Sequence, residues 1–130
     1  MMIVGIGTDI VEIRRVAKVF GGRASPLRRV LTEREQAQAA ALPASRRAAF
    51  YAKRFAAKEA IAKALGVGIG ARAHFHDIEI TRGDSGAPVV ALTGAALRTA
   101  LEKSGGKPVR VLLSLSDDVF AQAHAVIESL

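Results

Sequence analysis

The chain has 130 residues, a formal net charge of +7 and no cysteine. This length is enough for one domain with a hydrophobic core, at residues 1–130, and too short for two ordinary domains. The lack of cysteine excludes disulfides, thiolate zinc sites and thiol nucleophiles. No apolar run is long enough to cross a bilayer, and residues 1–10 lack the basic start of a signal peptide. We therefore expect a cytoplasmic protein with no membrane-inserted part.

The positive charge favours an acidic partner but does not identify it. Only 5% of the residues are aromatic, with no tryptophan and one tyrosine, so stacking platforms for single-stranded nucleic acid are poorly supplied. Neither a helix-turn-helix pattern nor zinc-finger spacing is present. We expect no nucleic-acid partner, which leaves an acidic ligand or protein, or a merely basic surface.

The chain opens with a predicted buried strand at residues 1–13, where apolar residues surround two glycines. A short helix is expected at residues 12–20, ended by Gly21 and Gly22. Basic residues gather on this helix and on the turn that Ser25-Pro26 opens. They form a basic patch, which is either a solvated face or a docking surface for an acidic partner: Arg14, Arg15, Lys18, Arg23, Arg28 and Arg29.

A capping box of Thr32 and Glu35 predicts a further helix, which ends at Leu42 before a proline. The next helix is the longest, from about Ser45 to Leu65, and a glycine supplies its C-terminal cap. The second half of this helix reads RFAAKEAIAKALG and is apolar on nearly all sides. We therefore expect it to be buried at the centre of the fold.

After the long helix we expect a hairpin, a helix and a further strand. The hairpin strands are 77–82 and 88–92, the helix covers 94–104, and the strand covers 109–116. Residues 119–128 fit either a helix or a strand that pairs back after a turn. Because the order of elements has no βαβ rhythm, the predicted fold class is α+β, with an antiparallel sheet packed against the long central helix.

The long helix carries charges that need an explanation. Glu59 and Lys63 share one strip of it, and Arg54 and Lys58 share a roughly opposite strip. Burying such groups costs free energy unless each finds a partner. Asp9 and Glu59 together suit Mg²⁺, which takes one or two carboxylates, and Lys63 could then neutralise a phosphate. The alternatives are a plain ion pair between Glu59 and Lys63 and a turn or capping role for Asp9.

Several motifs resemble holo-acyl-carrier-protein synthase, the small bacterial type of 4′-phosphopantetheinyl transferase. The motifs are GIGTDIVEIRRV at 5–16, RFAAKEAIAKALGVGIG at 54–70, DIEI at 77–80, and SLSD and AHAVIE toward the end. The resemblance runs from end to end in the right order. This family transfers the phosphopantetheine arm of coenzyme A to a serine of apo acyl carrier protein, for fatty acid biosynthesis, and releases adenosine 3′,5′-bisphosphate.

The resemblance also implies roles for individual residues. It makes Asp9 and Glu59 the Mg²⁺ ligands and adds Lys63 as the third catalytic residue. Its candidates for binding coenzyme A are Arg54, Lys58, Lys63 and the backbone of Gly66, Gly68 and Gly70. Its candidates for docking the carrier protein, whose acidic helix would explain the basic patch, are Arg14, Arg15, Arg28 and Arg29. Finally, it implies a homotrimer with active sites between subunits.

One position departs from the family. Many members carry a histidine directly after the Ser-x-Ser near the C-terminus, and here that position is Asp117. The general base is therefore open between Glu59, a metal-bound water and Asp117. His74 and His76 fall on no functional position of the family. They are two residues apart with no cysteine or third histidine nearby, so we expect no metal there.

Two other functional classes remain as alternatives. A basic nucleic-acid-binding module would explain the charge, and its affinity would fall steeply with salt and ignore Mg²⁺. It would not explain acidic residues inside the two most apolar motifs. A non-catalytic interaction module would keep the fold but lose Asp9, Glu59 or Lys63, and all three are present.

Overall fold

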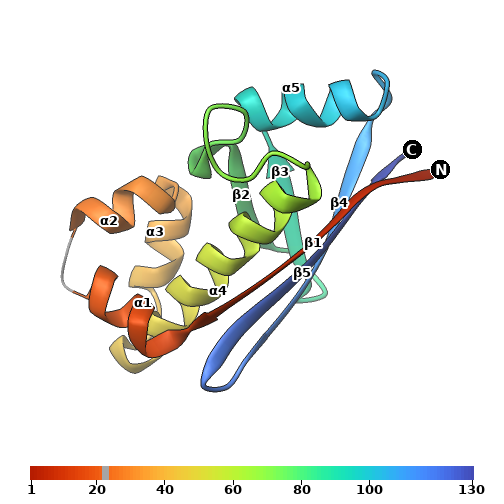
Figure 1. Ribbon diagram of the computed structural model, residues 1–130. Coiled ribbons are helices and arrows are strands. Elements are labelled where there is room, and N and C mark those ends of the chain that lie inside the picture. The colour runs from red at the N-terminus through yellow and green to blue at the C-terminus, as the bar shows by residue number, and fades with distance from the viewer. Residues whose placement is uncertain (22–23) are drawn as a thin grey trace.

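The long helix α4 (Ala44–Ala64) lies at the centre of the fold, and the other elements surround it (Figure 1). This computed structural model describes residues 1–21 and 24–130. Gly22 and Arg23, expected at the end of the first helix and in the basic patch, lie outside the described residues. The other elements are β1 (Met2–Glu12), α1 (Ile13–Phe20), α2 (Ala24–Val30), α3 (Glu33–Ala40), the 3-10 helix η1 (Phe75–Asp77), β2 (Ile78–Arg82), β3 (Pro88–Leu92), α5 (Gly94–Lys103), β4 (Val109–Asp117) and β5 (Phe120–Ser129).

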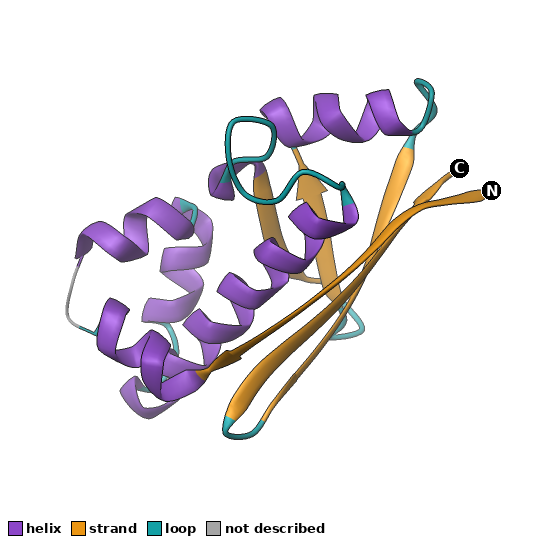
Figure 2. Ribbon diagram, in the orientation of Figure 1, coloured by secondary structure: helices purple, strands orange, loops and turns teal. Residues whose placement is uncertain are grey.

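The strands form two antiparallel sheets, as the predicted fold class requires. The larger sheet has the order β1-β5-β4, and the smaller one pairs β2 with β3. Figure 2 shows the long strands crossing one side of α4, while α1, α2 and α3 gather near its beginning. Met2 pairs with Ser129, so the two ends of the chain lie side by side.

Most of the predicted helices and the hairpin are confirmed. The capping box closes in both directions, with Thr32 N donating to Glu35 Oε1 at 2.9 Å and Glu35 N donating to Thr32 Oγ1 at 3.2 Å. The helix expected at 45–65 is α4, and the strands expected at 77–82 and 88–92 are β2 and β3. Within the described residues, no helix is long and apolar enough to span a membrane.

The segment 119–128, which fits both helix and strand, forms strand β5. Alanine favours a helix locally, but β5 pairs with a neighbour on each edge and buries one face, and these contacts outweigh that preference. The residues of the buried face alternate along the strand and are at most 1% exposed: Ala121, Ala123, Ala125 and Ile127.

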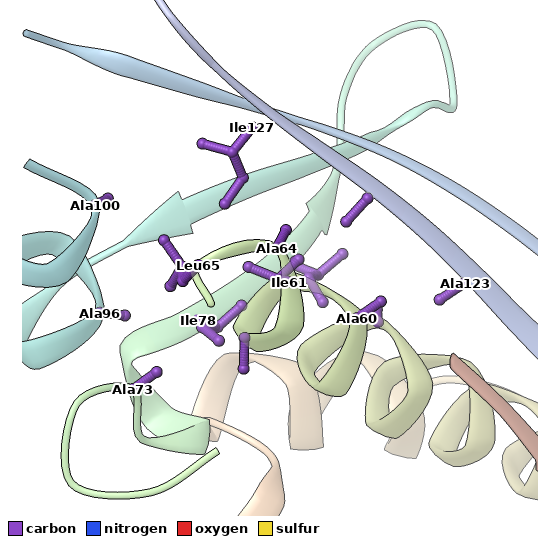
Figure 3. Packing of buried hydrophobic residues seen from close by; sticks show 14 of the residues in the cluster. Ala60, Ile61, Ala64, Leu65, Ala73, Ile78, Ala96, Ala100, Ala123 and Ile127 are labelled. Atoms are coloured by element: carbon purple, nitrogen blue, oxygen red, sulfur yellow. The ribbon is translucent and has the colours of Figure 1, made fainter. Parts of the chain in front are cut away.

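The main core lies between α4 and the strands. Ile61 and Leu65 of α4 belong to one buried cluster with Ile78 of β2 and Ile127 of β5 (Figure 3). The rest of the buried surface of α4 is largely alanine, including Ala60, so the helix approaches its neighbours closely. The expectation of a buried central helix is therefore confirmed.

Strand β1 is only half buried, which corrects the expectation of a buried strand. Because successive side chains of a strand point to opposite faces, α4 covers only every second residue. On the other face, Ile6 and Ile10 are 72% and 57% exposed. Ile6 is paired with Val126, which is paired with Leu112, so these three residues form an apolar row across the open face of the sheet.

Candidate active site

The close approach of β1 to α4 builds the first part of the site. A Cβ atom on Gly5 would lie 1.8 Å from the carbonyl oxygen of Ala64, so only glycine fits there. Gly7 of β1 lies equally close to the helix one turn earlier, at the carbonyl oxygen of Ala60. Because β1 lies directly against the helix, Asp9 at its far end reaches the charged strip of α4.

Lys63 bridges α4 and β1. Its Nζ atom donates to Asp9 Oδ1 at 3.0 Å and to the carbonyl oxygen of Thr8 at 3.1 Å. Among the residues described, no ion pair joins Glu59 to Lys63, so the plain helical pair considered above is not the arrangement found. About half of the Lys63 side chain remains exposed to solvent, which leaves its ammonium accessible to a ligand.

Asp9 and Glu59 form a pair of carboxylates suited to a cation. Asp9 Oδ2 is buried and has no hydrogen-bond partner. Burial raises the pKa of Glu59, and the charge of Asp9 raises it further, while Lys63 lowers it. A divalent cation bound here would coordinate the unpaired oxygen and offset the repulsion between the two carboxylates. No group of three or more candidate metal ligands occurs in the described part of the chain.

Lys58 does not face this site or solvent. It is fully buried, and its Nζ atom donates to Glu35 Oε1 at 2.6 Å, to Val30 O at 2.7 Å and to Phe75 O at 3.0 Å. A lysine has three donors, and all three are used. The expectation that Lys58 binds a phosphate of coenzyme A is therefore wrong for this structure.

The glycines after α4 terminate the helix. Gly66 and Gly68 have φ of 79° and 67°, and their amides donate to the carbonyl oxygens of Lys63 and Ala62. The amide of Gly70 donates to Ala73 O at 3.0 Å. These three amides are therefore occupied, and the end of a helix carries partial negative charge. This corrects the expectation that they cradle phosphates.

A second, strongly basic cavity lies on the other side of α4. Its volume is about 760 Å³, and α3, α4, β2 and the end of β4 line it. The one acid in its lining, Asp117, pairs with Lys53 at 3.1 Å. The basic residues of this cavity are Arg34, Arg46, Lys53, Arg54 and Arg82.

Arg54 is the most buried cation of this basic cavity. Its guanidinium lies 4.5 Å from the centre of the Phe50 ring, and its Nε atom is buried without a hydrogen-bond partner. Burial lowers the pKa of Arg54; Glu35 counteracts this effect and Arg82 adds to it. An unpaired donor among several cations favours an anionic ligand such as a carboxylate or a phosphate.

One chain does not bring the two sites together. Arg54 and Lys63 are nine residues apart on α4, which corresponds to roughly 14 Å along the axis and to opposite sides of the helix. The placement of Arg54 and Glu59 on opposite strips of the helix is therefore consistent with the cavity lining, which includes Arg54 and not Glu59. Arg34 and Arg82 were missed, because they come from α3 and β2 and no spacing in the sequence links them to Arg54.

The described arginines of the basic patch are exposed on α1 and α2, at the end of the molecule where α4 begins (Figure 1). They are Arg14, Arg15, Arg28 and Arg29. Beside them lies an apolar hollow of about 430 Å³, lined by β1, α1, α4 and β5. His76 Nε2 donates a hydrogen bond to Arg28 O, and among the described residues neither His76 nor His74 joins a group of candidate metal ligands.

Known proteins match the chain over nearly its full length. Residues 5–120 match the model of the 4′-phosphopantetheinyl transferase superfamily. A holo-[acyl-carrier-protein] synthase of Geobacillus kaustophilus is 45% identical over 99% of this chain and 92% of its own length. A crystal structure of the synthase of Bacillus anthracis, in complex with CoA (3′,5′-ADP), covers all of both chains at 40% identity and a TM-score of 0.83.

The synthase of Helicobacter pylori, solved with coenzyme A, covers 95% of this chain and 99% of its own at 32% identity and a TM-score of 0.77. These similarities agree with the α+β architecture of the chain. The chain therefore belongs to the 4′-phosphopantetheinyl transferase superfamily and, within it, to the holo-acyl-carrier-protein synthases.

Proposed function

We propose that this chain transfers the 4′-phosphopantetheine arm of coenzyme A to a serine of apo acyl carrier protein. The products are holo acyl carrier protein and adenosine 3′,5′-bisphosphate, and the reaction serves fatty acid biosynthesis. The observation that carries the proposal is the cluster of Asp9, Glu59 and Lys63, in which a buried carboxylate oxygen lacks a partner beside an accessible ammonium. The relatives of this chain include synthases whose structures were solved with coenzyme A.

The three residues have distinct roles in this reaction. Mg²⁺ held by Asp9 and Glu59 would neutralise negative charge on the diphosphate. Lys63 places a second positive charge beside the same oxygens, where charge grows as the bond to the leaving nucleotide breaks. The serine hydroxyl forms the new bond to phosphorus as the bond to the leaving bisphosphate breaks, and its proton passes to a base at the site, for which Glu59 is a candidate. Because binding fixes both reactants, alignment supplies a large part of the acceleration.

The nucleotide of coenzyme A would occupy the basic cavity of a neighbouring subunit. Arg54 would hold its phosphates, helped by the other cations that line the cavity. Since Arg54 and Lys63 lie on opposite sides of α4, one coenzyme A molecule would contact Lys63 of one copy and Arg54 of the next. We therefore favour a homotrimer with active sites between subunits. The apolar row of Ile6, Val126 and Leu112, in which Ile6 and Leu112 are exposed, offers a surface for this contact.

The basic patch would dock the carrier protein. Exposed arginines on α1 and α2 would pair with acidic side chains of the partner, and the adjacent apolar hollow would receive an apolar one. The residues proposed for the ionic contacts are Arg14, Arg15, Arg28 and Arg29. This reaction is expected in the cytoplasm, with no nucleic acid and no membrane as partner.

Intact-mass spectrometry tests the function directly. Apo acyl carrier protein is incubated with coenzyme A and this protein, with and without Mg²⁺. The expected result is a gain of one phosphopantetheine group that requires Mg²⁺. No gain with any carrier protein, from a folded chain that binds coenzyme A, would overturn the proposal.

A further inference from the structure

The carboxylate of Glu35 connects three elements inside the protein. Its Oε1 atom accepts from Thr32 N at 2.9 Å, at the start of α3, and from Lys58 Nζ at 2.6 Å, on α4. Its Oε2 atom accepts from Ile80 N at 2.9 Å, on β2. Glu35 and Lys58 are both fully buried, so no water or ligand competes for these bonds.

The same three elements form the main walls of the basic cavity. Glu35 directly follows Arg34 on α3, and Ile80 is two residues before Arg82 on β2. Lys58 lies one helical turn beyond Arg54 on α4. The bonds from Lys58 and Ile80 therefore join α3, which carries Arg34, to the walls that carry Arg54 and Arg82, and the bond from Thr32 caps α3 itself. The lining residues of these walls include Arg34 and Gln38 of α3, Arg46, Lys53 and Arg54 of α4, and Thr81 and Arg82 of β2.

Without a central tie, the cations of the cavity would favour a wider arrangement. Arg54 and Arg82 repel each other, and the pKa of Arg54 is lowered partly by this charge. The charge of Glu35 acts in the opposite direction on Arg54. The carboxylate thus lies behind the cavity wall, where it can both tie the elements and offset the repulsion.

We propose that Glu35 is a positioning residue of this enzyme, whose hydrogen bonds to Lys58 and Ile80 hold α3, α4 and β2 at the spacing that lets the basic cavity bind the nucleotide of coenzyme A. This inference rests on the proposed function, because it assigns the cavity to that nucleotide. Glu35 acts through Arg34, Arg54 and Arg82 and has no contact with the substrate itself.

The effect of Glu35→Gln on nucleotide affinity distinguishes a positioning role from a purely electrostatic role and from a role in stability alone. A glutamine has one acceptor oxygen, while all three partners of Glu35 are donors, so at least one tie is lost in either orientation of the amide. If Glu35 acted only through its charge, removing a negative charge would tighten binding of an anion. If it acted only on stability, the folded variant would bind with unchanged affinity.

The experiment is calorimetric titration of the folded protein with adenosine 3′,5′-bisphosphate at fixed salt. A positioning role predicts that Glu35→Gln raises the Kd about tenfold or more. The matched control is Glu33→Gln, which makes the same change in charge at an exposed position of the same helix and should leave the Kd within about twofold. An unchanged or tighter Kd for Glu35→Gln would overturn the inference.

Two further measurements keep the result interpretable. Urea denaturation establishes the folded fraction. If Glu35→Gln does not fold, the double variant Glu35→Gln/Lys58→Met replaces it, because it leaves neither partner of the buried pair as an uncompensated charge. The double variant is expected to lose affinity in the same way, and wild-type affinity in it would count against the inference. Phosphopantetheine transfer by the wild-type protein is measured in parallel. Normal transfer with unchanged affinity in the variants overturns the inference alone, whereas a wild-type protein that neither binds the nucleotide nor transfers overturns both.

Discussion

Gly7 of β1 faces Ala60 of α4 with no room for a side chain between them. A Cβ atom on Gly7 would lie 1.9 Å from the carbonyl oxygen of Ala60 and 2.7 Å from the amide nitrogen of Ala64. Both neighbours are backbone atoms of a buried helix, so neither can move aside locally. The distance between the strand that carries Asp9 and the helix that carries Lys63 therefore depends on this glycine.

The substitution Gly7→Ala is expected to force β1 away from α4. We expect it to lower the free energy of unfolding by about 3 kcal/mol, as overpacking of a core does, and to abolish most phosphopantetheine transfer. Urea denaturation and intact-mass assays measure the two effects. Gly70→Ala is the control for stability, since nothing lies within 4 Å of a Cβ there. Equal stability of the two variants would contradict this account of the strand–helix contact.

Lys58→Met is expected to be strongly destabilising. It leaves the carboxylate of Glu35 buried without its cation, and breaking a buried pair in this way costs about 3–5 kcal/mol. The comparison is Arg72→Gln, which removes an ion pair with Glu102 in which both side chains are more than half exposed. That change should cost less than about 1 kcal/mol. Thermal and urea denaturation of both variants measure the difference. Equal losses in the free energy of unfolding would contradict a larger contribution from the buried pair.

Local sequence signals predicted most of the fold. The Thr32–Glu35 capping box and the alternation of 77–82 and 88–92 depend on neighbouring residues, and the structure confirms them. The open face of β1 could not be predicted in this way. Apolar residues fill both faces of that strand, and only the placement of α4 decides which face is covered. Likewise, residues 119–128 form a strand because of partners on both sides.

The candidate site was predicted in part. Asp9 and Lys63 are 54 residues apart, yet the motifs around them identified both, and the structure brings them to 3.0 Å. Lys58 was assigned to the wrong environment, because a helical wheel gives the direction of a side chain and not its partner. That partner, Glu35, was recognised only as a capping residue. Its second role depends on a contact across 23 residues that no local pattern reveals.

The pKa of Glu59 should respond to its two charged neighbours in opposite directions. In the folded chain without metal, Asp9→Asn removes a repelling charge and lowers this pKa, whereas Lys63→Met removes an attracting charge and raises it. Because the native pKa lies above the unfolded value, this group's contribution to stability decreases as the pH rises through that interval. Carbon-detected NMR titration of the Glu59 carboxyl measures the shifts. Shifts of the same sign in both variants would be inconsistent with this electrostatic picture.

The open face of the sheet should control assembly. We expect the wild-type protein to sediment as a trimer and Ile6→Glu to sediment as a monomer without transfer activity, because it places a charge in the apolar row. Val89→Glu, at a 50% exposed position on the separate hairpin, is the matched control and should remain trimeric. A wild-type monomer that is active at low concentration would rule out active sites between subunits.

Asp9→Asn should separate catalysis from nucleotide binding. It removes the negative charge beside the unpaired Oδ2 atom, so Mg²⁺ loses one of its two proposed ligands. We expect phosphopantetheine transfer to fall by about a hundredfold or more. Binding of adenosine 3′,5′-bisphosphate should change much less, because the basic cavity lies on the other side of α4. Intact-mass time courses over a Mg²⁺ titration measure the first effect and calorimetry the second.

Asp118→Asn, the same change at an exposed turn, should behave like the wild-type protein. Full Mg²⁺-dependent transfer by Asp9→Asn would remove Asp9 from the proposed mechanism.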